Sequence, residues 1–190
     1  MKLSRGRVAW IVGLAATLLL AVIARPFVHL AWTAWNDVDR RETPPAGTLD
    51  DASRLNRTTV AEVWSMPPDE SEAERGLVDL LGRARRDGRK VAIAGARHSM
   101  GGQTLFPDGI VVDLLKHDRF ELDERHEILR AQAGARWSEI LPYLDARGRS
   151  IGVMQSNNSF TVGGSVSVNC HGWSYGCPPI ASTVESFRLM

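Results

Sequence analysis

One apolar segment near the N-terminus divides this chain into two parts of different character. Residues 8–24 (VAWIVGLAATLLLAVIA) contain no charged residue and follow the basic stretch MKLSRGR. At a rise of about 1.5 Å per residue this segment alone is marginal for a membrane-spanning helix. The run FVHLAW after Arg25-Pro26 extends it, and tryptophans near both ends suit the membrane–water interfaces. Residues 1–35 are therefore predicted to be a membrane anchor or a signal segment.

The two alternatives differ in whether the segment is retained. Val22-Ile23-Ala24 has the small-residue character of a signal-peptide cleavage site. We favour a retained anchor, because the apolar run exceeds a usual signal core and Pro26 closely follows the cleavage site. In both cases the positive N-terminal flank predicts that the rest of the chain lies on the extracytoplasmic side, and the retained anchor predicts a single-pass membrane protein.

Composition excludes several classes of protein. The 190 residues carry a formal net charge of +1, so no basic excess exists to neutralise the phosphates of a nucleic acid. Cys170 and Cys177 are the two cysteines, too few for a disulfide-stapled small fold. The part after the apolar segment is therefore expected to fold by burying a hydrophobic core.

The polar residues 36–57 carry Pro44-Pro45-Ala46-Gly47 and show no helical or strand periodicity, so they are predicted to be a linker. A globular domain is predicted over 58–190. Its first element is a strand at 58–64, followed by a helix with Asp69 or Ser71 as N-cap and Gly88 as its stop.

Further elements alternate along the rest of the domain. Strands are predicted at 91–94 and 109–114, and a charged hairpin around Arg125-His126. A second helix is expected over 137–147, with an apolar face formed by Trp137, Ile140, Leu141 and Leu144. The chain ends in ESFRLM, which is predicted to be a strand of a longer architecture. The pattern indicates the α+β class.

Two glycine-rich stretches carry the residues most suited to chemistry. The first is GARHSMGGQ, residues 95–103, and follows the strand at 91–94 directly; the second is FTVGGSVSVNCHG, residues 160–172. Neither matches a P-loop or the GxGxxG pattern of dinucleotide folds. Small residues after a strand let backbone N–H groups converge on an anion, so the first stretch predicts a pyrophosphate site, with Arg97 and Ser99 as further donors.

The GxxHS loop after a strand, the segment AQAGARWSEIL and the stretch TVGGSVSVNCHG, in this order, resemble the FAD-linked oxidases of the vanillyl-alcohol oxidase type, and most closely the sugar-lactone and alditol oxidases. The resemblance covers roughly residues 58–190. It implies a PCMH-type FAD-binding domain of two α+β subdomains, and a separate C-terminal substrate domain that is expected to be absent from this chain. The implied cofactor is FAD.

Carried onto this sequence, the resemblance implies cofactor-binding residues in both stretches. They are Gly95, Ala96, Arg97, His98, Ser99, Met100, Gly101 and Gly102 in the first, and Ser156, Thr161, Gly163, Gly164, Val168, Asn169, Cys170 and His171 in or near the second. In relatives of this kind the histidine of the GxxHS loop is often bonded to the 8α carbon of the flavin, which makes His98 the candidate for covalent attachment. The alternative is that His98 hydrogen-bonds the loop or the phosphate.

Other residues are less specific. The family usually has a pair such as Gly-Thr before His-Gly, where this chain has Asn169-Cys170. The cofactor contacts of these two residues are therefore left undecided. His171 is either a flavin contact or structural, and Cys170 comes too late to match the second tether of some relatives. The spacing of the cysteines and histidines fits no common zinc site, so no metal is expected. His117 and His126 are expected to be solvated, and His29 to lie at the membrane interface.

The leading hypothesis is a membrane-tethered, FAD-dependent oxidoreductase that oxidises a CH–OH group of a sugar, alditol or aldonolactone-like substrate. Its electrons would pass to oxygen or to a quinone-like acceptor. Catalytic residues are not identified, because they are expected in the missing half. The alternative is a non-catalytic flavin-binding or interaction module. Within the enzymes, a reductase of cell-wall precursor synthesis with the same fold is disfavoured, since such enzymes are cytoplasmic.

Overall fold

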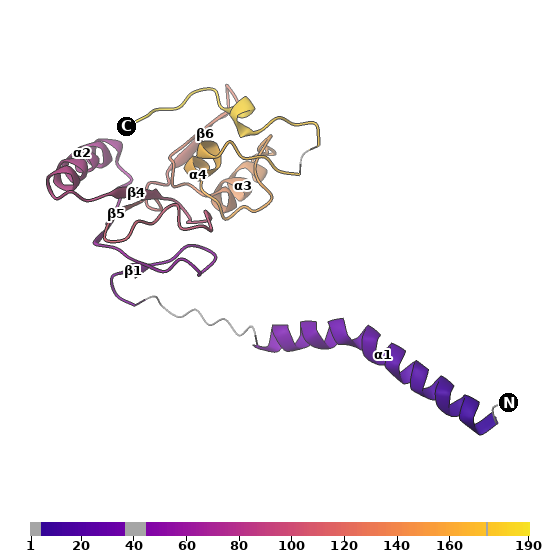
Figure 1. Ribbon diagram of the computed structural model, residues 1–190. Helices are drawn as coiled ribbons and strands as arrows, with labels where there is room; N and C mark the ends of the chain where they lie inside the picture. Colours follow the sequence, from indigo (N-terminus) through magenta and orange to yellow (C-terminus); the bar gives the residue numbers. More distant parts are fainter. Residues whose placement is uncertain (1–4, 37–44, 174) are drawn as a thin grey trace. The chain divides into compact units, whose positions relative to one another are not determined.

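The computed structural model describes residues 5–36, 45–173 and 175–190 of the chain (Figure 1). It separates into two compact units, Met1–Thr43 and Pro44–Met190. The first unit contains one helix, and the second contains the sheet, the remaining helices and both glycine-rich stretches. Each unit is described by itself below.

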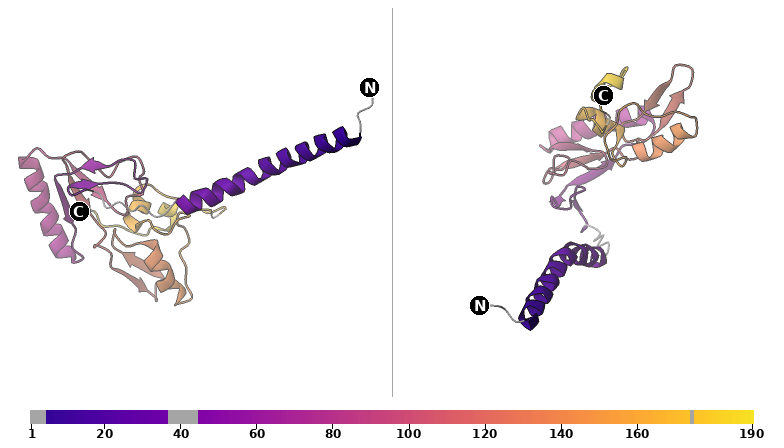
Figure 2. Two further views of the ribbon diagram at one scale, coloured as in Figure 1. Left: turned by 90° about the horizontal axis from the view of Figure 1, so that it is seen from below. Right: turned by 90° about the vertical axis from the view of Figure 1, so that its right-hand side faces the viewer.

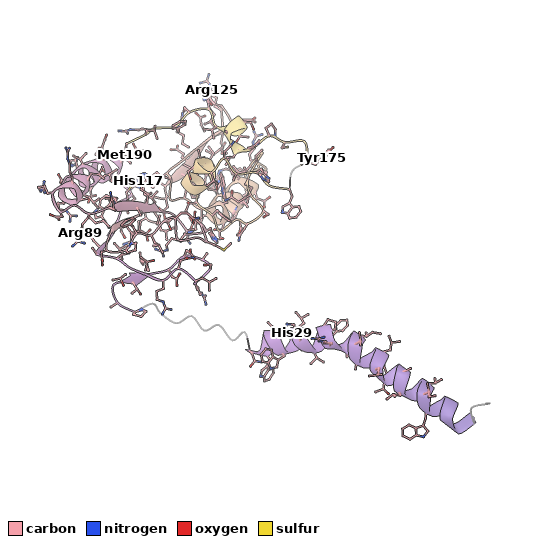
Figure 3. The ribbon with its side chains drawn as sticks, viewed as in Figure 1. His29, Arg89, His117, Arg125, Tyr175 and Met190 are labelled. Atoms are coloured by element: carbon pink, nitrogen blue, oxygen red, sulfur yellow. The ribbon has the colours of Figure 1, made fainter. Side chains whose placement is uncertain are left out.

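The N-terminal unit is the helix α1, Arg5–Asn36. The segment Ala9–Asn36 of this helix is long and apolar enough to cross a membrane, since it extends for about 42 Å at 1.5 Å per residue. Pro26 lies inside the helix and does not end it, so the run FVHLAW extends the apolar segment as predicted. The histidine expected at the interface, His29, lies within this same helix (Figure 3).

A three-stranded parallel sheet forms the centre of the second unit. Its strands are β3 (Glu62–Ser65), β4 (Val91–Ala94) and β5 (Ile110–Asp113), in the order β3-β5-β4. β5 is the middle strand, with Ile110, Val111 and Val112 all buried. A continuous apolar run is what a parallel strand covered on both faces requires. The strands predicted at 91–94 and 109–114 are thus confirmed.

Helix α2, Glu70–Arg86, covers one face of this sheet (Figure 1). Asp69 is its N-cap and accepts a hydrogen bond from the backbone N–H of Glu72 at 2.9 Å, which confirms the predicted start. Buried Leu80 packs in one core with Ile110 and Val112. Full burial of each such side chain contributes about 1.5–3 kcal/mol, so this contact orients the strands that carry the site.

The opposite face of the sheet is covered by the segment that precedes β3. Here β1 (Thr48–Leu49) pairs antiparallel with β2 (Thr58–Thr59), and Val60 packs with Val111 of β5. The predicted linker over 36–57 therefore differs from the structure in its second half, while residues 37–44 lie outside the described residues. Long-range pairing, which local polarity does not reveal, orders the segment. The strand predicted at 58–64 is two short strands, β2 and β3.

A second core is formed by the later elements (Figure 2). The hairpin β6 (Phe120–Asp123) and β7 (Ile128–Ala131) packs with helix α3, Trp137–Asp145. Helix α4, Val162–Ser167, follows the start of the second glycine-rich stretch, and a short 3-10 turn, η1, spans Ile180–Thr183. The indole N–H of Trp137 donates to Ser165 Oγ at 2.8 Å, which ties α3 to α4. The predicted hairpin, second helix and α+β class are confirmed.

Two further expectations are wrong in this unit. His117 is buried, with 6% of its surface exposed, because its Nδ1 lies 2.8 Å from the carbonyl oxygen of Pro67 (Figure 3). The segment 184–190 forms no strand. Its Arg188 instead lies 3.1 Å from both Glu70 Oε2 and Glu74 Oε2 on α2, so charge pairing rather than a sheet holds it.

Candidate functional site

The two glycine-rich stretches meet through the side chain of His98. Its Nε2 lies 2.7 Å from Ser159 Oγ, and its ring stacks on Phe160 with centroids 4.3 Å apart and planes 24° from parallel. His98 stands in the loop after β4, whereas Ser159 and Phe160 immediately precede α4. Residues far apart in the sequence therefore form one surface around this imidazole.

The hydrogen bonds around Ser159 bear on the tautomer of His98. The Ser159 hydroxyl donates its one proton to Asn157 Oδ1 at 2.8 Å. Its oxygen can then accept a proton from His98 Nε2, which is the contact made by the tautomer with the imidazole proton on Nε2. In that tautomer Nδ1 is the unprotonated, nucleophilic nitrogen.

At Gly95 the first stretch lies directly against the second. A Cβ at this position would overlap Thr161 Oγ1 and lie 3.1 Å from Thr161 Cγ2. Thr161 is buried and caps α4, because its Oγ1 accepts from the backbone N–H of Gly164 at 3.3 Å. Only a glycine allows the first loop to lie directly on this cap.

The middle of the first loop offers unused donors. Among the described residues, the backbone N–H groups of residues 96–100 and the Ser99 hydroxyl have no protein acceptor. Backbone N–H groups without a protein acceptor are available to an anion. The loop therefore fits the negatively charged diphosphate of a dinucleotide cofactor.

Arg97 makes a contact that the sequence did not indicate. Its backbone is in the left-handed region with φ 54°, and its Nη1 lies 3.4 Å from Asp113 Oδ2 at the end of β5. Asp113 also accepts from the backbone N–H of Leu115 through Oδ1 at 2.9 Å. The Arg97 guanidinium is thus paired with the Asp113 carboxylate. Its role as a phosphate donor stays a prediction.

The end of the first loop is held by residues outside both stretches. Gly102 has φ +73° and donates its N–H to Asp51 Oδ2 at 3.0 Å, while the N–H of Gly101 bonds Gln103 Oε1. The carbonyl of Met100 accepts from the side-chain amide of Asn56 at 3.3 Å. Asp51 and Asn56 were missed in the sequence, because they lie in the segment predicted to be a linker.

The second stretch is anchored to the segment after β7. The N–H of Gly163 donates to the carbonyl of Ala133 at 2.9 Å, and that of Val162 to Ala135 at 2.8 Å. These bonds hold the start of α4 against residues 133–135. Of the residues predicted in this stretch, Thr161 contacts the first loop, at Gly95, and Gly163 and Gly164 follow it in α4. Sequence reasoning overlooked the Ser159 hydroxyl and the ring of Phe160, which contact His98.

The remaining predicted positions have other surroundings. Ser156, Val168 and His171 are exposed, and Asn169 Oδ1 accepts from the backbone N–H of Ala181 at 3.1 Å. Cys170 is buried, which raises the pKa of its thiol, and its Sγ donates to Gln155 Oε1 at 2.9 Å. Gln155 Nε2 is buried and has no hydrogen-bond partner among the described residues. The described residues contain no group of metal-ligating side chains.

Comparisons with known proteins identify the family of this chain. Residues 70–190 match the family described as FAD binding domain. L-galactono-1,4-lactone dehydrogenases 2 and 1, both mitochondrial proteins of Oryza sativa subsp. japonica, are each 30% identical over 114 residues, 60% of this chain and 20% of theirs. The chain thus spans about a fifth of the length of these curated relatives.

Solved structures show the same fold. A cholesterol oxidase from B. sterolicum superposes with a TM-score of 0.51 at 19% identity, over 66% of this chain and 24% of that one. A solvent-stable cholesterol oxidase gives a TM-score of 0.52 at 23% identity, with the same 66% and 24% coverage. The likeness concerns the fold, which in both cases is a minor part of the longer protein.

Proposed function

Because this chain belongs to the FAD binding domain family, with FAD as its cofactor, we propose that it is the FAD-binding part of an oxidoreductase that acts on CH–OH groups. The observation that carries the proposal is the junction of the two glycine-rich stretches inside the matched residues. There, backbone N–H donors without a protein acceptor and the imidazole of His98 belong to the same loop.

The two ends of the site suit different parts of the cofactor. The unpartnered N–H groups of residues 96–100, with the Ser99 hydroxyl, would hold the diphosphate. His98 and Phe160, which present an imidazole and an aromatic ring, would lie at the flavin. When bound, FAD supplies the acceptor for the hydride equivalent that leaves the substrate carbon.

Covalent attachment through His98 is part of the proposal. The Ser159 contact occupies Nε2 and leaves Nδ1 as the bonding atom. Attachment would join Nδ1 of His98 to the 8α carbon of the flavin, with loss of one methyl proton, the imidazole N–H proton and two electrons, which together would reduce dioxygen to hydrogen peroxide. A tethered flavin cannot dissociate and is usually a stronger oxidant.

The substrate class is proposed to be a sugar, alditol or aldonolactone. Support comes from the L-galactono-1,4-lactone dehydrogenases that resemble this chain. The electron acceptor is proposed to be oxygen or a quinone-like carrier. A quinone would suit a protein anchored in a membrane by α1, with its FAD-binding part on the extracytoplasmic side, as the basic N-terminal flank favours.

The test uses the colour of the purified full-length protein. We expect a yellow protein whose flavin fluorescence stays with the polypeptide after acid precipitation and denaturing gel electrophoresis. His98→Ala should release the flavin into the supernatant while the protein still folds. His126→Ala, at an exposed histidine paired with Asp123 on the hairpin, is the matched control and should keep it.

The outcomes separate the parts of the proposal. A colourless protein that takes up no FAD on incubation would refute the proposed function. Flavin that binds but is lost in acid would refute the tether alone. Turnover of aldonolactones and alditols with oxygen and with a soluble quinone then identifies the substrate class and the acceptor.

A further inference from the structure

Asp51 lies before the residues that match the family, yet it is part of the first loop's support. It is 5% exposed, in a segment with no strand or helix of its own. Its Oδ1 accepts from the N–H of Ser53 at 2.9 Å and from the Ser53 hydroxyl at 2.5 Å. Its Oδ2 accepts from Asn56 Nδ2 at 2.8 Å and from the N–H of Gly102 at 3.0 Å.

Two more bonds join the same segment to the loop. The N–H of Ala52 donates to the carbonyl of Arg97 at 2.9 Å, and Asn56 Nδ2 donates to the carbonyl of Met100 at 3.3 Å. The segment 51–56 therefore holds the loop at residue 97, at residue 100 and at residue 102. The N–H groups of residues 96–100 are not used in these contacts and stay available.

The chemistry of the bonds explains why a carboxylate stands at this position. Each bond to Asp51 comes from a donor, and an ionised carboxylate accepts on both oxygens without offering a proton. Hydrogen bonds to a charged acceptor are stronger than neutral ones. Asp50 supports the turn in the same way, since its Oδ1 accepts from the N–H groups of Asp51 and Asn56.

We propose that Asp51 and Asn56 form a latch that positions residues 97–102 to receive the diphosphate of FAD. They act through the loop backbone and are positioning residues, not cofactor contacts. The proposal rests on the proposed placement of the diphosphate at residues 96–100. Without the latch, the loop would lose conformational entropy when FAD binds, and the affinity for FAD would fall.

The experiment measures reversible binding in the full-length protein. All variants are made in the His98→Ala background, so that no covalent bond obscures the equilibrium. Asp51→Asn keeps the shape of the side chain but turns one acceptor into a donor, which faces the donors of Gly102, Asn56 or Ser53. Because a hydrogen bond to a charged acceptor is lost, we expect FAD affinity to fall roughly 10- to 100-fold.

Two comparisons make the result specific. Asp79→Asn carries the same chemical change at an exposed position of α2 and should leave FAD affinity unchanged. ADP serves as a probe that carries a diphosphate but no flavin. Because the latch acts on the diphosphate loop, Asp51→Asn should weaken ADP and FAD by the same factor and leave the absorption spectrum of bound FAD unchanged.

Asn56→Ala covers the case in which Asp51→Asn does not fold, because it keeps the buried carboxylate. It should also weaken FAD and ADP equally, and the double variant should lose less than the sum of the single losses, since the two residues share one hydrogen bond. Wild-type affinity for both probes in folded variants would overturn the latch. Failure of ADP to compete with FAD in the parent protein would instead overturn the diphosphate placement.

Discussion

Ser159 Oγ lies 2.7 Å from His98 Nε2, across 61 residues of sequence, and its hydroxyl proton is used by Asn157. The contact therefore does more than join two loops. It engages Nε2 of His98 and leaves Nδ1 as the nitrogen that Ser159 does not contact.

Replacing this hydroxyl tests its role in attachment. Ser159→Ala removes the acceptor for Nε2–H, so Nδ1 is no longer held in its unprotonated form. A hydrogen bond of about 0.5–1.5 kcal/mol corresponds to a roughly 3- to 10-fold slower incorporation of covalent flavin. The rate is followed by flavin fluorescence on denaturing gels after FAD is added to apoprotein. Ser182→Ala, whose hydroxyl bonds only the nearby Pro179 carbonyl among the described residues, should match the wild type.

The close approach of the loops is tested by adding one methyl group. Gly95→Ala places a Cβ against Thr161 Oγ1, so the loops must separate, and we expect a loss of about 1–3 kcal/mol in unfolding free energy together with weaker FAD binding. Gly82→Ala is the matched control. Its Cβ lies on α2, 3.6 Å from Arg86 Nη1, and should stabilise the protein by about 0.5–1 kcal/mol. Equal stability of the two variants in urea unfolding would contradict the predicted contact.

Acid should lower the folding stability of the protein by protonating Asp51. Hydrogen bonding from the Ser53 hydroxyl, with further bonds from Gly102 and Asn56, lowers the pKa of Asp51 below 3.8. The native state therefore prefers the ionised form, and its contribution to stability is present above the ordinary pKa and lost as pH falls through the lowered one. Asp51→Asn removes this titration. Its unfolding free energy should be lower than wild type at pH 7 and decline less between pH 4 and pH 2, whereas Asp79→Asn should follow the wild-type curve more closely.

Membrane attachment is tested by a charge in the middle of α1. Arginine at the centre of a membrane helix costs about 2.5–3.5 kcal/mol. Leu19→Arg should therefore move much of the protein from the carbonate-resistant membrane pellet into the soluble fraction, while Leu19→Ala stays in the pellet. Wild-type protein found in the carbonate supernatant would refute a retained anchor.

Cys177 reports on which side of the membrane the FAD-binding unit lies. Its thiol is exposed, whereas that of Cys170 is buried. A membrane-impermeant maleimide added to intact cells should label the wild type and not Cys177→Ser. Labelling that appears only after the cells are lysed would place this unit on the cytoplasmic side.

Local signals in the sequence were sufficient for several elements. The capping pattern at Asp69 predicted the start of α2, and the apolar face of Trp137, Ile140 and Leu144 predicted α3. Helix α4 was not anticipated, because Gly163 and Gly164 are poor helix formers. Its formation depends on the Thr161 cap and on the indole of Trp137, which comes from a distant element.

Contacts over long distances account for what the sequence could not reveal. His117 looks solvated in LKHDR, and its burial depends on the carbonyl of Pro67, 50 residues away. Asp51 looks like a linker residue, and its burial depends on Gly102. The glycine-rich stretches were recognisable as a site because their composition is unusual, but the partners Ser159 and Asp51 are of ordinary types.

The position of β5 in the middle of its sheet has a practical consequence for any shortened form of this protein. β5 is paired on one side by β3, and β3 lies before residue 70. A truncated version that begins at Glu70, as the family boundary would suggest, would turn this buried strand into an open, aggregation-prone edge. An expression boundary near residue 44 instead retains every strand of the sheet, and is the sensible limit for crystallisation of the part without its helix α1.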